Sequence, residues 1–182
     1  LNNINVGTQY LISQRDRISS KKTRIIASQQ QVVRYDREST DEINLKSRDS
    51  ILDIFKKIIK NYDLLLLSDY GKGVLTYDLT RSLISFANKN NKRVLVDPKG
   101  FDYSKYNGAY LLTPNKKEAS EATRTSITDK KSLRQAIIQL KNECELDVSL
   151  ITLSEQGIAV FDDELHIHPT VTREVFDVTG AG

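Results

Sequence analysis

The side chains that could do chemistry in this 182-residue chain gather in five short segments rich in glycine, proline and charged residues. The segments are SDYGKG from Ser68, DPKG from Asp97, TPNKKE from Thr113, TLSEQG from Thr152 and DVTGAG from Asp177. Together they offer ammonium groups, carboxylates, an amide and accessible backbone N–H groups, which are the groups that hold phosphate and hydrated cations. As a set they predict a site that handles phosphate.

Two of these segments carry a specific signal. Gly71 and Gly73 flank Lys72, so the backbone can approach a ligand closely while the ammonium offers a point charge to phosphate. Asn115 and Glu118 are three residues apart at a predicted helix start, so both can face one ligand or a hydrated metal ion.

The glycines of the last segment predict an anion site. Gly180 and Gly182 can expose successive backbone N–H groups, and such an arrangement before a helix attracts anions. Each segment alone has an ordinary structural explanation, because Asp-Pro and Pro-Asn are common turns and one Gly-rich stretch is weak evidence. The phosphate hypothesis therefore depends on all five segments meeting at one edge of a sheet.

The apolar residues predict elements that would create such an edge. Strand-length apolar runs occupy residues 63–69, 92–97, 109–115 and 147–153, and apolar residues recur at helical spacing over 51–59, 76–87 and 133–144. This alternation predicts right-handed β-α-β units, hence an α/β fold with a mainly parallel central sheet and helices on both faces. Ligands bind outside the carboxyl ends of such strands, where the segments lie. The run 63–69 is apolar on both faces, as in a strand buried inside the sheet.

Other residues receive more ordinary interpretations. Residues 23–36 carry two β-branched clusters and predict an extended segment, on which Arg34 and Asp36 fit a lid over a substrate and a solvated strand face equally well. His166 and His168 are two apart without a third ligand nearby and favour a surface pair over a metal site. Cys144 lies on the apolar face of a predicted helix and fits core packing.

Composition excludes several classes of protein. Hydrophobic residues make up 38% and charged residues 28%, as in a soluble globular protein. No apolar run reaches the roughly 18 residues of a membrane span, and no signal peptide opens the chain. Lys plus Arg exceed Asp plus Glu by only 27 to 24, which suits phosphorylated small molecules and does not indicate nucleic acid. One cysteine and no repeat or linker predict a single domain over residues 1–182 and a cytoplasmic location.

The segments as a set resemble the ribokinase-like (PfkB) carbohydrate kinases, whose signature is Asp-Thr-x-Gly-Ala-Gly-Asp. In DVTGAG, Asp177, Gly180, Ala181 and Gly182 are in register, and Val178 replaces the Thr. This Val, together with SDYGKG, VDPKG, LLTPN and LSEQG, is similar to the subgroup that phosphorylates D-glycero-β-D-manno-heptose 7-phosphate. The resemblance covers nearly the whole chain.

The resemblance implies a ribokinase-like fold with a small β lid near the N-terminus. It implies transfer of phosphate from ATP, with Mg²⁺ and K⁺, to the anomeric hydroxyl of the sugar phosphate, in the synthesis of ADP-heptose and lipopolysaccharide core. It further implies a homodimer and, in many members of the subgroup, fusion to an adenylyltransferase. The family's catalytic Asp follows the Gly-Ala-Gly, so the sequence is expected to be an incomplete kinase domain that is inactive by itself.

Roles for individual residues also follow from the resemblance. The backbone amides expected to form the anion hole for the γ-phosphate are those of Gly180, Ala181 and Gly182, and the side chains expected near a monovalent cation are those of Asp177 and Thr179. The residues expected to bind ATP are Asn115, Lys116, Lys117, Glu118, Thr152, Ser154, Glu155 and Gly157, with Glu118 holding Mg²⁺ through water.

The residues expected to bind the sugar phosphate are chosen by their charge and by their position at the strand ends. These residues are Asp69, Lys72, Asp97, Lys99 and, from the lid, Arg34. Lys72 and Lys99 are the expected counter-ions of the 7-phosphate. Two alternatives stay open at this point: a ribokinase-like kinase for another sugar, and a nucleotide-binding protein without catalysis, because a fold does not fix chemistry.

Overall fold

The computed structural model describes residues 7–28 and 30–170. Its first half contains, in chain order, β1 (Lys21–Ala27), β2 (Gln30–Arg37), α1 (Leu45–Ile58), η2 (Ile59–Asn61), β3 (Leu64–Ser68), α2 (Tyr77–Lys89) and β4 (Arg93–Asp97). The second half contains η3 (Ser104–Tyr106), β5 (Leu111–Leu112), α3 (Lys116–Thr123), α4 (Lys130–Glu143), β6 (Val148–Thr152), η4 (Ser154–Gln156), β7 (Ile158–Phe161) and β8 (Leu165–His168).

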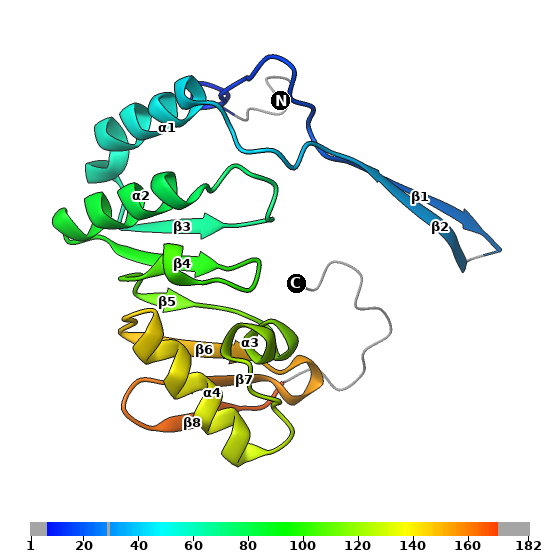
Figure 1. The fold of residues 1–182 in the computed structure, drawn as a ribbon, viewed down its shortest axis with the longest axis vertical. Coiled ribbons are helices and arrows are strands. Elements are labelled where there is room, and N and C mark those ends of the chain that lie inside the picture. Colours follow the sequence, from blue (N-terminus) through cyan, green and yellow to red (C-terminus); the bar gives the residue numbers. More distant parts are fainter. Residues whose placement is uncertain (1–6, 29, 171–182) are drawn as a thin grey trace.

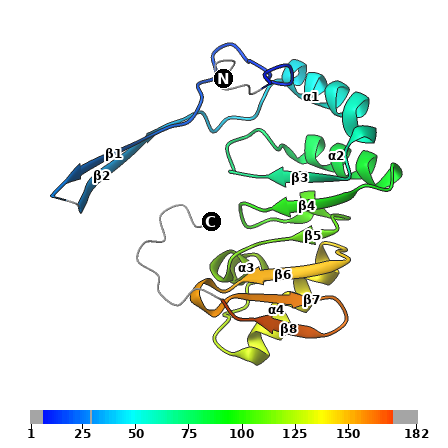
Figure 2. The same cartoon turned by 180° about the vertical axis from the view of Figure 1, so that it is seen from behind.

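The strands form two sheets (Figure 1). Six strands follow one another in the order β3-β4-β5-β6-β7-β8. The first four are parallel, and β7 and β8 add an antiparallel hairpin at the far side. The other sheet is the antiparallel pair β1–β2, which projects from the body beyond the carboxyl ends of the parallel strands (Figures 1 and 2). The mainly parallel α/β fold and the small β segment near the N-terminus are thus confirmed.

The described helices lie on one face of the large sheet. The parallel strands are added in one direction, and right-handed crossovers in one direction place every connecting helix on the same side. α1 joins this layer by packing on α2, with the Phe55 and Phe86 rings 5.9 Å apart. Figure 1 shows α4 in front of the strands, and Figure 2 shows the strands in front of α4. Strand residues such as Val94, Val96 and Ile151 are fully buried and belong to the same hydrophobic core as the helix residues Leu79, Leu83 and Ile137.

No described helix covers the opposite face of the sheet (Figures 1 and 2), although the sequence predicts helices on both faces. β3 is an edge strand, and the Leu64 and Leu66 side chains on that face are 48% and 62% exposed. The prediction that residues 63–69 form a strand buried on both faces is therefore wrong for the described part of the chain. The apolar pattern identifies the strand, but burial of its second face depends on which other segments cover it.

Local sequence explains where the helices begin. The side chains of Asn44, Thr76, Asn115 and Asp129 each accept a hydrogen bond from a backbone N–H in the first turn of the following helix. Cys144 is buried at the end of α4, which confirms its interpretation as a core residue. Within the described ranges, no helix combines the length and the apolar character needed to cross a membrane.

Candidate functional site

A cavity of about 700 Å³ lies between the β1–β2 hairpin and the carboxyl ends of the parallel strands. Eight residues that sequence analysis had assigned to the site line it: Arg34, Asp69, Lys72, Asp97, Lys99, Asn115, Glu118 and Thr152. Six further lining residues are Lys22, Asp36, Glu38, Tyr70, Pro98 and Thr113. The structure therefore brings four of the five sequence segments and the extended N-terminal segment to one place.

The register of the sheet explains this convergence. Ser68 at the end of β3 pairs with Asp97 at the end of β4, and the Asp69 N–H donates to the Asp97 carbonyl at 3.0 Å. On the other side, Asn115 forms an isolated parallel bridge with Thr152. The polar segments thus begin level with one another because neighbouring parallel strands end in register.

The Lys72 loop is held against the base of the hairpin. The Lys72 ammonium forms an ion pair with Glu38, and Arg17 donates to the Lys72 carbonyl. Gly73 has a positive φ of 73°, and its carbonyl accepts from the Ile43 N–H at 2.9 Å. A Cβ at Gly73 would overlap the Asp41 backbone. The glycines beside Lys72 therefore allow a close approach between two segments of this chain.

Lys99 lies beside the start of α3. Its ammonium donates to Glu118 Oε1 at 2.6 Å, and this hydrogen bond raises the pKa of Lys99. Glu118 Oε2 accepts from the Asn115 N–H at 3.0 Å, while Asn115 Oδ1 accepts from the Glu118 N–H at 2.9 Å. This capping box fixes Asn115 and Glu118 at the helix N-terminus. A residue expected on the sugar side is thus in contact with one expected on the nucleotide side.

Asp97 carries a carboxylate that makes no hydrogen bond with the side chains or amides of the described residues. Partial burial raises its pKa above the ordinary value of 3.8, and the charge of Glu118 adds to this rise while Lys99 opposes it. A carboxylate with free lone pairs at a strand end can accept hydrogen bonds from the hydroxyl groups of a sugar.

The hairpin contributes a charged face to the cavity. Arg34 donates to Asp36 at 3.0 Å from Nε and 2.6 Å from an Nη atom, and this contact raises the pKa of Arg34 and lowers the pKa of Asp36. Because side chains alternate along a strand, Arg34 and Asp36 face the same way. The cavity thus contains both cations and carboxylates, which suits a ligand with both phosphate and hydroxyl groups.

Two lining residues were not predicted from the sequence, and only one of them has a signal in the sequence pattern. Glu38 continues the spacing of two from Arg34 and Asp36 and so lies on the same side of the hairpin. Lys22 is the cross-strand partner of Asp36, a relationship that requires the hairpin register. Tyr70 and Thr113 stand inside the recognised segments and carried no separate signal.

Several predicted residues lie outside the cavity lining. These are Lys116, Lys117, Ser154, Glu155 and Gly157. Lys117 is 84% exposed and lies 3.9 Å from Glu121 on its own helix. Gly157 has a positive φ of 93°, and a Cβ there would overlap the His168 carbonyl oxygen, so packing alone requires this glycine. The predicted residues Asp177, Thr179, Gly180, Ala181 and Gly182 lie outside the described residues.

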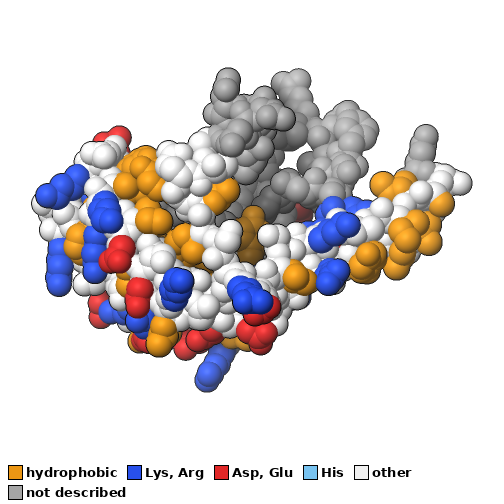
Figure 3. Space-filling view, turned by 90° about the horizontal axis from the view of Figure 1, so that it is seen from above, with side chains coloured by type: hydrophobic (Ala, Val, Ile, Leu, Met, Phe, Trp, Pro, Cys, Tyr) orange, Lys and Arg blue, Asp and Glu red, His pale blue; other side chains and the backbone are white. Residues whose placement is uncertain are grey.

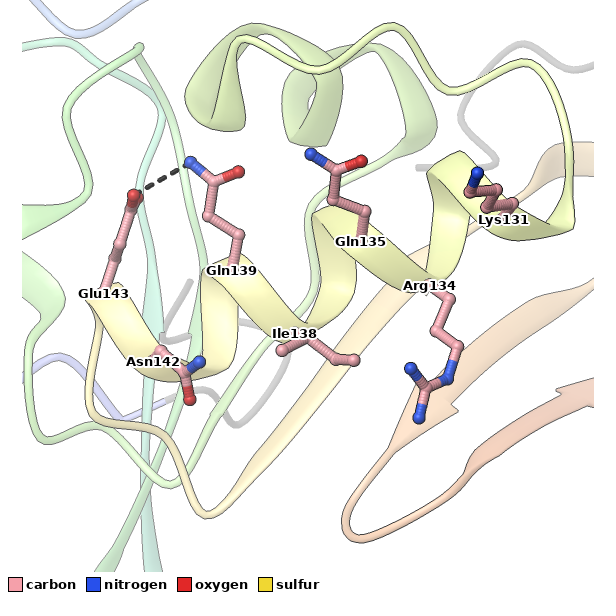
Figure 4. Close-up of a pocket in the computed structure, with 7 residues that line it drawn as sticks. All are labelled: Lys131, Arg134, Gln135, Ile138, Gln139, Asn142 and Glu143. Atoms are coloured by element: carbon pink, nitrogen blue, oxygen red, sulfur yellow. Dashed lines mark hydrogen bonds between the residues drawn. The ribbon is translucent and has the colours of Figure 1, made fainter.

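A second hollow, of about 640 Å³, runs along the outside of α4 (Figure 4). The side chains that form it, from Lys131 to Glu143, come from one helix and spread to both sides of it. Gln139 donates to Glu143 at 2.8 Å. Among the described residues, all those that line this hollow belong to α4, so no side chain of a second element faces them. The hollow is a feature of the helix surface and offers no chemistry.

The two histidines are exposed on β8, with ring centroids 6.4 Å apart. No group of three or more His, Cys, Asp or Glu side chains able to hold a metal ion occurs in the part of the chain that the structure describes. The exposure of both side chains fits a position on the protein surface.

Comparison with known proteins identifies the family of this chain. The model of the pfkB family carbohydrate kinases matches residues 1–182, and the chain belongs to this family. It is 60% identical over 182 residues to the bifunctional protein HldE of Aliarcobacter butzleri (strain RM4018), and 55% identical over the same length to that of Sulfurimonas denitrificans (strain ATCC 33889 / DSM 1251). Each alignment covers 100% of this chain and 38% of the relative.

Solved structures agree on the fold. The crystal structure titled Sa239 matches with a TM-score of 0.74 at 14% identity, covering 97% of this chain and 57% of that one. Arabidopsis thaliana ribokinase complexed with ribose and ATP matches with a TM-score of 0.61 at 20% identity, over 71% of this chain and 42% of that one. At these identities the likeness concerns the fold alone.

Proposed function

We propose that this chain belongs to a kinase domain that transfers the γ-phosphoryl group of ATP to the anomeric hydroxyl of D-glycero-β-D-manno-heptose 7-phosphate, giving the 1,7-bisphosphate. Family membership, the identity to two bifunctional HldE proteins and the subgroup-specific sequence segments support this proposal. The observation that carries it is the cavity in which the hairpin meets the lysines at the strand ends. Because the relatives are bifunctional and longer, we also propose an adenylyltransferase domain in the same polypeptide.

The sugar phosphate is proposed to bind at the β3 and β4 ends. Lys72 and Lys99 would hold the 7-phosphate, and each already has a carboxylate partner, Glu38 or Glu118. Phosphate, with more charge than a single carboxylate, can compete for these ammonium groups. Asp97 would accept hydrogen bonds from sugar hydroxyls, and Arg34 would close on the substrate from the hairpin.

The nucleotide is proposed to bind at the β6 end and the start of α3. The N-terminus of α3 favours negative charge, and the oxygen donors of Asn115, Glu118 and Thr152 are the type that Mg²⁺ prefers. Both Glu118 oxygens already accept hydrogen bonds, so the residues fit a hydrated ion held through water. When bound, Mg²⁺ would neutralise charge on the ATP phosphates. The other proposed contacts are Lys116, Lys117, Ser154, Glu155 and Gly157 for ATP, Gly180, Ala181 and Gly182 for the γ-phosphate, and Asp177 and Thr179 for K⁺.

A homodimer is proposed through the hairpin. An isolated two-stranded sheet is at best marginally stable in water, and both strands are exposed along their length. Aliphatic side chains gather on this arm (Figure 3), among them Ile25, Ile26, Val32 and Val33. Pairing with a second copy would cover them. We place the enzyme in the cytoplasm, where ATP is available and the single buried cysteine stays reduced.

The test is product formation by the full-length protein. With Mg-ATP and heptose 7-phosphate, we expect ADP to form. Phosphorus NMR should show a second sugar-phosphate signal, from the new phosphate on the anomeric oxygen. Unphosphorylated heptose, ribose and fructose 6-phosphate serve as competing substrates. Faster turnover of one of these would replace the proposed substrate. ATP binding without turnover of any sugar would favour a nucleotide-binding protein without catalysis.

A further inference from the structure

Asp69 differs from the other carboxylates of the cavity in being enclosed. Its side chain is only 3% exposed, although it directly follows β3 and contributes to the cavity wall. Oδ1 accepts from the Gly71 N–H at 2.7 Å. Oδ2 accepts from the Lys105 ammonium at 2.6 Å and from the Tyr106 hydroxyl at 2.7 Å. A buried charge is tolerated when it is paired and hydrogen-bonded in this way.

Lys105 closes the loop that carries Lys72. Besides Asp69, its ammonium donates to the Leu75 carbonyl at 3.1 Å. The loop leaves β3 at Asp69 and returns toward α2 at Leu75, so one ammonium binds both of its ends. Lys105 also lies over the Tyr106 ring, 5.1 Å from the centroid, and is therefore held on two sides.

Tyr106 connects this arrangement to the loop that carries Lys99. Its hydroxyl is buried, and it accepts from the Lys99 N–H at 3.1 Å. The hydroxyl proton goes to Asp69, because that acceptor is charged and nearer than the Lys99 carbonyl at 3.3 Å. Burial raises the pKa of Tyr106, and the hydrogen bond to Asp69 also acts in this direction. The phenol therefore stays protonated and can donate.

We propose that Asp69, Lys105 and Tyr106 form a buried hub that fixes the distance between the Lys72 loop and the Lys99 loop. Lys105 and Tyr106 are then positioning residues for the sugar-phosphate side of the site, and Asp69 acts through the two loops. This inference rests on the proposed function for its kinetic consequence, because it assumes that Lys72 and Lys99 hold one phosphate. A phosphate bound by two cations requires their separation to be fixed, and displacement by about 1 Å can reduce a rate on the order of a hundred-fold.

Tyr106→Phe in the full-length protein tests the hub, and Tyr103→Phe is a matched control. Both rings are buried and pack against each other with centroids 5.7 Å apart. The Tyr103 hydroxyl, however, has no hydrogen-bond partner among the described residues, so its removal leaves the network intact. Lys105→Met, which keeps the chain length without the charge, is a second probe, and Lys105→Arg is the conservative variant.

The rate of backbone amide hydrogen exchange tests the hub in the absence of any substrate. In Tyr106→Phe we expect faster exchange of the Lys99 and Gly71 amides, whose acceptors are Tyr106 and Asp69, and no such change in Tyr103→Phe. In kinetics, Tyr106→Phe and Lys105→Met should raise the KM for heptose 7-phosphate by about ten- to a hundred-fold. The KM for ATP should stay within about two-fold, and Lys105→Arg should restore part of the loss.

Each outcome decides one of the two proposals. Unchanged exchange in Tyr106→Phe would overturn the hub, whatever the enzyme phosphorylates. Faster exchange with an unchanged KM for the sugar phosphate would overturn the positioning role. An equal fall in activity at all substrate concentrations, with a lower unfolding midpoint, would indicate a purely structural role and also overturn it. A wild-type protein that does not accept heptose 7-phosphate would overturn the proposed function, while amide exchange would still decide the hub.

Discussion

The Lys99 ammonium lies 2.6 Å from Glu118 Oε1, so the end of β4 and the start of α3 are joined by an ion pair across the site. The sequence predicts that Lys99 contacts the sugar phosphate and that Glu118 contacts the nucleotide. Their contact means that a change in Glu118 alters the charge that Lys99 presents to a ligand. The two sides of the site are therefore electrostatically coupled.

Glu118→Gln should affect the two substrates in opposite directions. The KM for Mg-ATP should rise about ten-fold or more, because an oxygen that orders the hydrated metal loses its charge. The KM for the sugar phosphate should fall by up to about five-fold, because Lys99 is released from a competing carboxylate and exposed pairs contribute about 0.2–1 kcal/mol. Initial rates with each substrate varied separately give both values. Glu121→Gln, one turn further along α3, is the control, and a rise in both KM values would contradict the coupling.

Gly73→Ala should destabilise the fold more than Gly100→Ala. Both glycines have positive φ, so both variants carry backbone strain of about 1–2 kcal/mol. A Cβ at Gly100 meets nothing within 4 Å, whereas at Gly73 it overlaps the Asp41 backbone. The excess loss in the free energy of unfolding, measured with denaturant, therefore reports contact between the hairpin base and the Lys72 loop. Equal losses in the two variants would mean that the two segments can separate at little cost.

Much of this site could be predicted from the sequence because its parts are local. The apolar runs located the strands, and in a parallel sheet the residues after each strand meet at one edge. This placed Lys72, Lys99, Asn115 and Thr152 without any knowledge of tertiary contacts. The capping box between Asn115 and Glu118 is equally local, since it spans three residues.

The remaining features depend on contacts between distant segments. The spacing places Glu38 on the side of Arg34 and Asp36, but its ion pair with Lys72 joins residues that are 34 apart in the chain. Whether Gly157 serves a ligand or packing is decided by the approach of His168. The exposure of Leu66 likewise depends on what covers that face of the sheet. Spacing and composition do not contain this information.

Asp97→Asn should stabilise the protein at neutral pH. The folded state raises the pKa of Asp97, chiefly by burial, so the folded state binds a proton more tightly than the unfolded state does. The stabilisation that proton binding to Asp97 gives the folded state is therefore lost as pH rises through the raised pKa. The difference from wild type should vanish below the unfolded value of 3.8, where both states are protonated. The measurement is the free energy of unfolding as a function of pH.

Asp102→Asn provides a comparison of opposite sign. Hydrogen bonds from Ser104 lower the pKa of Asp102, so this carboxylate stabilises the folded state above its unfolded pKa, and the stabilisation is lost as pH falls through the lowered value. Asp102→Asn should therefore destabilise the protein at neutral pH. If both variants shift stability in the same direction, the environment assigned to Asp97 is wrong.

Asp97→Asn should in addition raise the KM for the sugar phosphate, because the variant lacks a carboxylate that accepts hydrogen bonds from the sugar hydroxyl groups.

Lys72→Ala and Lys99→Ala should reduce the preference of the full-length enzyme for the phosphorylated sugar. Loss of a charge-assisted phosphate contact costs about 1.5–3 kcal/mol, or roughly ten- to a hundred-fold in kcat/KM. The Lys72 side chain is 34% exposed and that of Lys99 is 53% exposed, so the larger effect is expected for Lys72, whose charge is less screened by water.

The measurement is the ratio of kcat/KM for heptose 7-phosphate to that for unphosphorylated heptose, with Lys117→Ala as the control. Lys117 belongs to the same strand-end segment as Asn115 but lies outside the cavity lining and is proposed to contact ATP only, so its removal should leave the ratio between the two sugars unchanged. A wild-type ratio in both Lys72→Ala and Lys99→Ala would mean that other residues hold the phosphate. A ratio reduced in Lys72→Ala alone would assign the phosphate to the Lys72 loop and leave Lys99 as the partner of Glu118.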